Sequence, residues 1–221
     1  MSVFSPASRN RLTAHDRDRF GSDSLFDRIG RAVCDAGCLP RKELYEAWEV
    51  ARRTRRLFRG GRVVDVAGGH GLLAQILLLL DDSSPVALVV DPALPQSAAK
   101  IQAALVEQWP RLAGRATFRE APLDGERLEA SDLVVSSHAC GALTDQVIAA
   151  AVAARARVSV LPCCHDIETC DAGALGGWLD APLAIDAMRA VRLEQAGYRV
   201  WTQEIPATVT PKNRLLLGAP L

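Results

Sequence analysis

Two short segments of this chain concentrate the side chains that can move protons or bind metals. SSHACGALTD contains His138 and Cys140, and LPCCHD contains Cys163, Cys164 and His165. Together they hold two of the chain's four histidines and three of its six cysteines. Imidazole groups exchange protons near neutral pH, and thiolates and imidazoles are common ligands of zinc. We therefore consider three interpretations: an acid–base centre, a metal site and a redox pair.

The adjacent cysteines constrain this choice. Neighbouring residues have poor geometry for a disulfide, which disfavours a redox pair between Cys163 and Cys164. Strand alternation turns them to opposite faces, so we expect one to pack inward and the other to face the site. A zinc ion bound by His138, Cys140, one of these cysteines and His165 remains an alternative, although no C-x2-C or H-x3-H spacing supports it. The main prediction includes no metal.

Hydrophobic patterning predicts the elements that position these segments. From residue 62 onward, short buried runs of β-formers alternate with helical stretches, which is typical of a parallel sheet with crossover helices. We expect an α/β fold: a Rossmann-like, seven-stranded, mostly parallel sheet with flanking helices, plus an N-terminal helical extension. The predicted strands cover residues 62–67, 86–91, 116–121, 131–138, 157–163, 198–205 and 213–220, and the crossover helices include 70–80, 142–154 and 186–197.

The chain divides into three parts on this pattern. Residues 1–22 are polar and without period, which predicts a disordered arm. Residues 23–60 form the predicted helical extension, and residues 61–221 form the predicted catalytic domain. In a doubly wound sheet, ligands bind at the carboxyl ends of the strands. Because strands four and five are expected to be neighbours, we predict that the two chemistry-bearing segments meet at that edge.

A glycine-rich turn follows the first predicted strand. In VVDVAGGHG, small residues allow a tight turn and a close approach of a ligand, while amides at the following helix N-terminus can meet a negative group. Asp91 ends the second strand, where a carboxylate can accept both hydroxyls of a ribose. Asp124 follows the third strand, where it could meet an adenine amino group. The dinucleotide spacing G-x-G-x-x-G is absent, which argues against a nicotinamide enzyme.

These features resemble class I S-adenosylmethionine-dependent methyltransferases. DVAGGHG is similar to their first motif, Asp-x-Gly-x-Gly-x-Gly, with Ala67 in place of the first glycine, and Asp91 and Asp124 match their ribose and adenine acids. The resemblance implies methyl transfer with S-adenosylmethionine as cofactor. The cofactor-binding residues that it implies are Asp65, Ala67, Gly68, Gly69, His70, Gly71, Asp91, Leu123, Asp124 and Ser136.

The combination H-x-C-G-x-x-T-D with P-C-C-H resembles a narrower subgroup. That subgroup includes the transfer-RNA 2′-O-methyltransferases that act on the acceptor stem, and related methyltransferase-like proteins. The resemblance covers residue 62 to the C-terminus, but the cysteine/histidine zinc modules of the transfer-RNA enzymes have no counterpart here. It implies a catalytic set beside the transferred methyl group, with His138 or His165 as a base toward a hydroxyl. That set is His138, Cys140, Cys164 and His165.

Charge and hydropathy suggest partners and location. Residues 1–62 carry 14 Lys and Arg against 8 Asp and Glu, and residues 51–62 are especially rich in arginine. This basic segment and the resemblance to the transfer-RNA enzymes together favour RNA as the acceptor, and the resemblance implies a transfer-RNA ribose hydroxyl. A small-molecule acceptor and a non-catalytic cofactor- or metal-binding partner protein are the alternatives. The longest apolar run, residues 72–80, is too short for a membrane span, so we expect a cytoplasmic protein.

Overall fold

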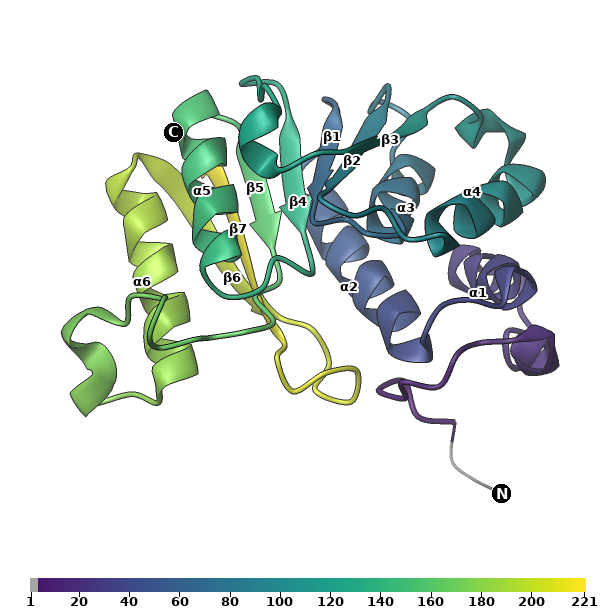
Figure 1. The fold of residues 1–221 in the computed structure, drawn as a ribbon, viewed down its shortest axis with the longest axis horizontal. Coiled ribbons are helices and arrows are strands. Elements are labelled where there is room, and N and C mark those ends of the chain that lie inside the picture. The colour runs from purple at the N-terminus through teal and green to yellow at the C-terminus, as the bar shows by residue number, and fades with distance from the viewer. Residues whose placement is uncertain (1–3) are drawn as a thin grey trace.

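The computed structural model describes residues 4–221, apart from the side chain of Asp124, and contains one seven-stranded sheet (Figure 1). The strand order is β3-β2-β1-β4-β5-β7-β6, and β7 runs antiparallel to both of its neighbours. This confirms the predicted fold class. The strands are β1 (Val63–Val66), β2 (Ala87–Asp91), β3 (Ala116–Glu120), β4 (Leu133–Ser136), β5 (Arg157–Val160), β6 (Tyr198–Glu204) and β7 (Arg214–Pro220).

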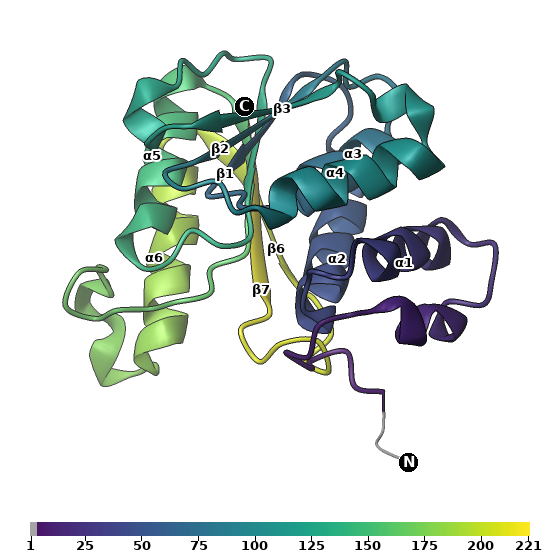
Figure 2. The ribbon, with the colours of Figure 1, turned by 45° about the vertical axis from the view of Figure 1, so that its right-hand side comes forward.

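Helices cover both faces of the sheet (Figures 1 and 2). The first four pack on one face, where they share a large apolar core with the strands, and the last two pack on the other face over a smaller core. Strand order reverses between β1 and β4, which is the position where doubly wound sheets bind ligands. The helices are α1 (Leu25–Ala36), α2 (Arg41–Leu57), α3 (Leu72–Leu80), α4 (Ser97–Gln108), α5 (Ala142–Ala154) and α6 (Ala181–Gln195).

Local sequence explains the short elements around the glycine turn. All four residues of β1 are buried, as expected for a central parallel strand with helices on both faces. α3 begins after Gly71, whose backbone is left-handed (φ 68°), and its leucine-rich sequence is buried on nearly every side. None of the helices in the described part of the chain is long and apolar enough to cross a membrane.

The N-terminal segment differs from the expected disordered arm. Within the described residues 4–22, Leu12 is fully buried and Phe20 is 2% exposed. The Leu12 amide donates a hydrogen bond to the carbonyl of Leu39, and a short 3-10 helix covers Ala14–Arg19. A few apolar anchors in an otherwise polar segment produce this packing, and they have no periodicity that a sequence pattern could reveal. Residues 1–3 lie outside the described part of the chain.

Several predicted boundaries also shift. α6 starts five residues before the predicted 186, because Pro182 sits in its first turn, where the ring is compatible with a helix. β4 and β5 end at Ser136 and Val160, earlier than predicted, since each chain leaves the sheet at the carboxyl edge. The two segments of interest are therefore loops. β4 pairs with β5 in parallel, which confirms that these loops leave neighbouring strands.

Candidate active site

The glycine turn joins β1 to α3 and lies against the end of β2. The Gly69 amide donates a 3.0 Å hydrogen bond to the Asp91 carboxylate, and the Ala93 amide donates another at 3.0 Å. Ala67 has a left-handed backbone (φ 52°), a conformation that glycine adopts without cost and alanine does not. The replacement of glycine by alanine in the motif is therefore accommodated with local strain.

Asp65 lies buried beneath this turn. One carboxylate oxygen accepts a hydrogen bond from the Ala74 amide at 3.2 Å, and the other has no hydrogen-bond partner among the described residues. Burial, and to a lesser degree the nearby charge of Asp91, raise the pKa of Asp65 to about 7, although the Ala74 amide opposes them. The turn thus contains an unsatisfied buried acceptor.

The shape of the turn fits a cofactor lying on it. A Cβ at Gly68 would collide with Val89 and Asp65, so the turn is packed tightly on its inner side. A Cβ at Gly69 would meet no atom within 4 Å, so its outer side is open. An open, glycine-lined surface beside the Asp91 carboxylate is what a ribose-bearing ligand requires.

The remaining predicted cofactor residues lie on neighbouring strand ends. Leu123 and Asp124 belong to a short 3-10 helix, Leu123–Gly125, that follows β3, and the side chain of Asp124 lies outside the described part of the structure. Its proposed contact with adenine therefore stays a prediction. Ser136 is buried at the end of β4, where its hydroxyl accepts a 3.1 Å hydrogen bond from the Ala139 amide. Ser136 thus shapes the loop that carries His138.

A cavity of about 410 Å³ has Glu43 in its wall, and the Glu43 carboxylate accepts a hydrogen bond from His70 of the glycine turn. His138 from the loop after β4 and the two cysteines from the loop after β5 form part of its wall. The N-terminal segment, the first turns of α2 and the loop between β6 and β7 supply the rest, including Arg9, Lys42 and Lys212. A larger cavity of about 520 Å³ lies between α6 and the β6–β7 pair, and its wall includes none of His138, Cys163 and Cys164.

Glu43 connects this cavity to the glycine turn. The Leu72 amide donates to Nδ1 of His70, so Nε2 carries the ring proton and donates to Glu43 at 2.7 Å. A ring nitrogen of His138 lies within 4.8 Å of both the Glu43 carboxylate and His70. Burial raises the pKa of Glu43, but the hydrogen bond from His70 and the electrostatic effects of His70, His138 and Lys42 together outweigh it, so the net pKa is lowered. Burial also lowers the pKa of His138, against an opposing effect from Glu43.

Sequence reasoning did not identify Glu43. An acid in the first turn of a helix is usually explained by the helix dipole, and nothing in the sequence connects α2 to the glycine turn. His70 was expected to border the cofactor, and the structure places it between that turn and Glu43. The contact joins residues 27 positions apart, and only the packing of α2 on α3 brings them together.

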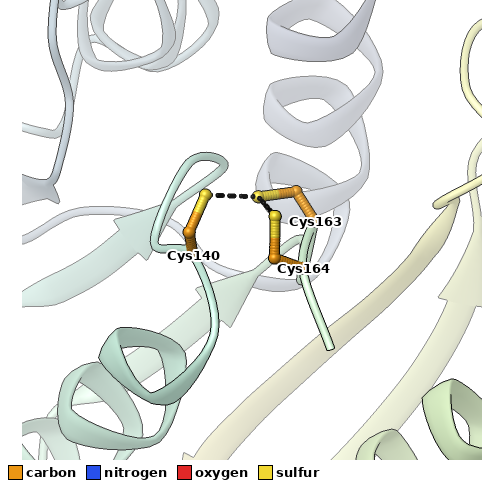
Figure 3. A group of neighbouring side chains, drawn as sticks. All are labelled: Cys140, Cys163 and Cys164. Atoms are coloured by element: carbon orange, nitrogen blue, oxygen red, sulfur yellow. Dashed lines mark hydrogen bonds between the residues drawn. The ribbon is translucent and has the colours of Figure 1, made fainter. Parts of the chain in front are cut away.

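The three cysteines of the two loops come together (Figure 3). The Sγ atoms of Cys140 and Cys163 are 3.1 Å apart, and those of Cys163 and Cys164 are 3.8 Å apart. Both adjacent cysteines line the cavity, so the expectation that one would pack inward is wrong. Alternation does not apply, because β5 ends at Val160 and the following residues have no regular structure. Burial raises the pKa of both Cys140 and Cys163.

His165 does not join this cluster, contrary to expectation. Its side chain is 3% exposed and Nε2 donates a 2.8 Å hydrogen bond to Asp186 of α6. Arg214 donates to the same carboxylate at 2.7 Å. Burial alone would raise the pKa of Asp186, but the hydrogen bonds from His165 and Arg214 lower it below its ordinary value. His165 therefore fastens the loop to α6 and does not face the acceptor cavity.

Comparison with known proteins assigns this arrangement to a family. A family model for a methyltransferase domain matches residues 43–169, which is more than half of the chain and includes the glycine turn and both loops. The chain belongs to this methyltransferase-domain family. The matched residues include Asp65, Asp91 and the glycine turn, which together form the open surface described above. The search of the curated proteins gave no match.

Solved methyltransferase structures share the fold. An O-methyltransferase family protein from Burkholderia thailandensis has 19% identity and a TM-score of 0.55, covering 96% of this chain and 64% of that protein. A putative RNA methyltransferase from Pyrococcus horikoshii has 15% identity and a TM-score of 0.51, with coverages of 79% and 83%. The 1,6-didemethyltoxoflavin-N1-methyltransferase of B. thailandensis, solved with S-adenosylhomocysteine, has 16% identity and a TM-score of 0.51, with coverages of 79% and 77%. The methyltransferase thus spans less than two thirds of the first of these proteins.

Proposed function

We propose that this methyltransferase transfers the methyl group to an anionic small molecule bound in the cavity between His138 and Lys212. The cavity of about 410 Å³ carries the proposal, because it lies within the size range of small-molecule sites and is linked to the glycine turn by the hydrogen bond between His70 and Glu43. It is bounded by five separate parts of the chain, so an acceptor there would be contacted from several sides.

The charges of the cavity support an acceptor with a phosphate or carboxylate group. Lys42 pairs with Glu46, and the Glu43 carboxylate accepts a hydrogen bond from His70, so these three side chains already have partners within the chain. Among the described residues, no ion pair involves the side chain of Arg9 or Lys212. Two cations from separate segments at one cavity would attract and orient an anion.

His138 is the residue that we assign as the base. The glycine turn and Asp91 would hold S-adenosylmethionine, which would supply a methyl group bonded to a positively charged sulfur; the acceptor atom would bond to that carbon as the carbon–sulfur bond breaks. The acceptor must lose a proton in this step, and the imidazole of His138 lies in the cavity wall to receive it. Glu43, held by His70, then orients the ring and offsets its positive charge.

The arginine-rich segment gives little support to RNA docking. Arg55 is buried and contacts Ser84 and Asp81, and Arg62 pairs with Asp132 and Glu126. The end of this segment precedes β1, whereas the glycine turn follows β1. The end of the segment therefore lies at the opposite edge of the sheet from the glycine turn and the cavity.

RNA remains the second candidate acceptor because of the loop motifs. H-x-C-G-x-x-T-D and P-C-C-H resemble the subgroup that contains transfer-RNA 2′-O-methyltransferases, and these motifs lie at the cavity. A single nucleotide turned into the cavity would present both a phosphate and a ribose hydroxyl.

One labelling experiment separates the two candidates. The purified enzyme is incubated with methyl-labelled S-adenosylmethionine and either a metabolite extract or total RNA, and labelled products are fractionated by anion exchange. We expect label in a small anionic product, with Lys212→Ala and Arg9→Ala raising KM for it and Arg56→Ala leaving it unchanged. Label confined to RNA would overturn the proposal in favour of the second candidate, and its loss with Arg56→Ala would show that the arginine-rich segment binds the RNA. Arg56 is a suitable control because it is exposed in the arginine-rich segment.

A further inference from the structure

Three thiols converge on one point at the wall of the acceptor cavity. Cys140 comes from the loop after β4, and Cys163 and Cys164 come from the loop after β5 (Figure 3). All three Sγ atoms lie within 4.8 Å of one another. Two adjacent residues seldom direct their side chains to the same place, and here the irregular backbone after Val160 lets them do so.

We propose that Cys140, Cys163 and Cys164 bind one zinc ion, with its fourth coordination position open to the acceptor cavity. Thiolates are soft ligands that favour zinc, and tetrahedral zinc has Zn–S bonds of about 2.3 Å. That geometry separates the sulfur atoms by roughly 3.8 Å. The observed separations of 3.1 Å and 3.8 Å require shifts of less than an ångström to reach it.

The histidines are committed elsewhere, so the site has three protein ligands. His165 is buried against Asp186, and His138 lies beside Glu43 and His70. The set therefore differs from the mixed imidazole and thiolate site considered from the sequence. Zinc sites with three protein ligands characteristically keep a fourth position for water or substrate. Cys163 and Cys164 line the cavity and Cys140 is exposed, which leaves such a position accessible.

An open zinc position at this wall could bind the acceptor atom directly and favour loss of its proton. This second step rests on the proposed acceptor cavity, whereas the binding of zinc does not. Metal binding itself requires loss of the thiol protons and needs no oxidant or reductant. A disulfide between Cys140 and Cys163 is the competing use of these residues, but it would leave Cys164 without a role.

The test uses the full chain, purified with a non-thiol reductant and freed of metal by a chelator. Zinc binding is measured by competition with a chromophoric chelator, and Co²⁺ is added in a parallel sample to detect sulfur-to-cobalt charge-transfer absorption. We expect one Zn²⁺ per chain and a thiolate–cobalt band. Cys140→Ser, Cys163→Ser and Cys164→Ser should each weaken zinc binding by at least about tenfold. Cys38→Ser, a partly exposed cysteine after α1, is the matched control and should bind as wild type does.

Circular dichroism and titration with S-adenosylhomocysteine accompany each variant. The inference is overturned if the folded, reduced wild type binds no zinc at micromolar free metal, or if the three variants bind as tightly as Cys38→Ser. Either result with S-adenosylhomocysteine still bound removes the metal site and leaves the methyltransferase assignment intact. If the folded, zinc-loaded wild type did not bind S-adenosylhomocysteine, the proposed cofactor site would be contradicted instead.

Discussion

At the level of single residues, the two loop histidines have different surroundings, so their substitution should have different effects on activity and stability. His138 faces the acceptor cavity, so His138→Gln should lower kcat by about 10²-fold or more through loss of the base. Its affinity for S-adenosylhomocysteine should stay near wild type, because the glycine turn is untouched. Steady-state kinetics with the acceptor found by labelling, together with calorimetry, measure both quantities.

Two other histidines provide the controls for that prediction. His165→Gln should lower stability, because Asp186 loses a buried partner, yet the folded variant should retain kcat. His15 is exposed in the N-terminal 3-10 helix, and His15→Gln should change neither the stability nor kcat. If His165→Gln abolished turnover while His138→Gln did not, the assignment of the base would be wrong.

The buried Asp65 should make stability depend on pH. Burial raises its pKa to about 7, so between roughly pH 4 and pH 7 the folded chain holds a proton that the unfolded chain releases. The free energy of unfolding therefore falls as pH rises through this window, by on the order of 1.4 kcal/mol for each pKa unit. Asp65→Asn should remove that slope and be more stable than wild type above neutral pH.

Urea unfolding at several pH values tests this difference between variant and wild type. Asp23→Asn changes an exposed carboxylate and should keep the wild-type slope, which separates Asp65 from the other titrating groups. If the free energies of unfolding of Asp65→Asn and wild type changed equally with pH across this window, a raised pKa at Asp65 would be contradicted.

At the level of elements, the alternation of strands and helices was enough to predict the seven-stranded sheet and the edge at which its loops meet. It was not enough to predict side-chain direction in those loops. Cys163 and Cys164 were placed by strand alternation, but β5 ends before they begin. Glu43 was missed because its contact with His70 depends on how α2 packs on α3, and such packing leaves no local pattern in the sequence.

Arg189 joins the two helices on the smaller-core face of the sheet. It is 1% exposed on α6 and donates two hydrogen bonds to Asp145 of α5, at 3.0 Å and 2.7 Å, and a third to the carbonyl of Gly141. Asp145, an acid in the first turn of α5, therefore also connects this helix to α6. Arg189→Met should cost roughly 3 kcal/mol of unfolding free energy, because it leaves a partly buried carboxylate unpaired.

An exposed ion pair on the same helix supplies the comparison. Arg192 pairs with Asp171 with both side chains more than 40% exposed, so Arg192→Met should cost less than about 1 kcal/mol. Chemical denaturation measures both variants. Equal losses from the two substitutions would show that the Arg189 network does not hold α5 and α6 together.

At the level of the whole molecule, the described N-terminal segment belongs to the main body. Leu12 and Phe20 lie in the same apolar core as α1 to α4, and Arg9 from this segment borders the acceptor cavity. The segment therefore links the stability of the fold to the shape of the cavity. Its polar composition hid this role, because isolated apolar anchors contribute packing without producing periodicity.

Phe20 and Gly30 provide a test of that packing. The effect of Gly30→Ala on the free energy of unfolding should change sign when the Phe20 ring is removed. The ring of Phe20 lies directly on α1 at Gly30, where an added Cβ would sit 2.3 Å from the ring. Phe20→Ala alone should cost about 3–5 kcal/mol, and Gly30→Ala alone should also destabilise by steric clash. In the Phe20→Ala background, however, Gly30→Ala should stabilise by up to about 1 kcal/mol, because alanine favours the helix and the clash is gone. A segment that did not pack here would give small, additive effects in urea unfolding, with Gly30→Ala stabilising in both backgrounds.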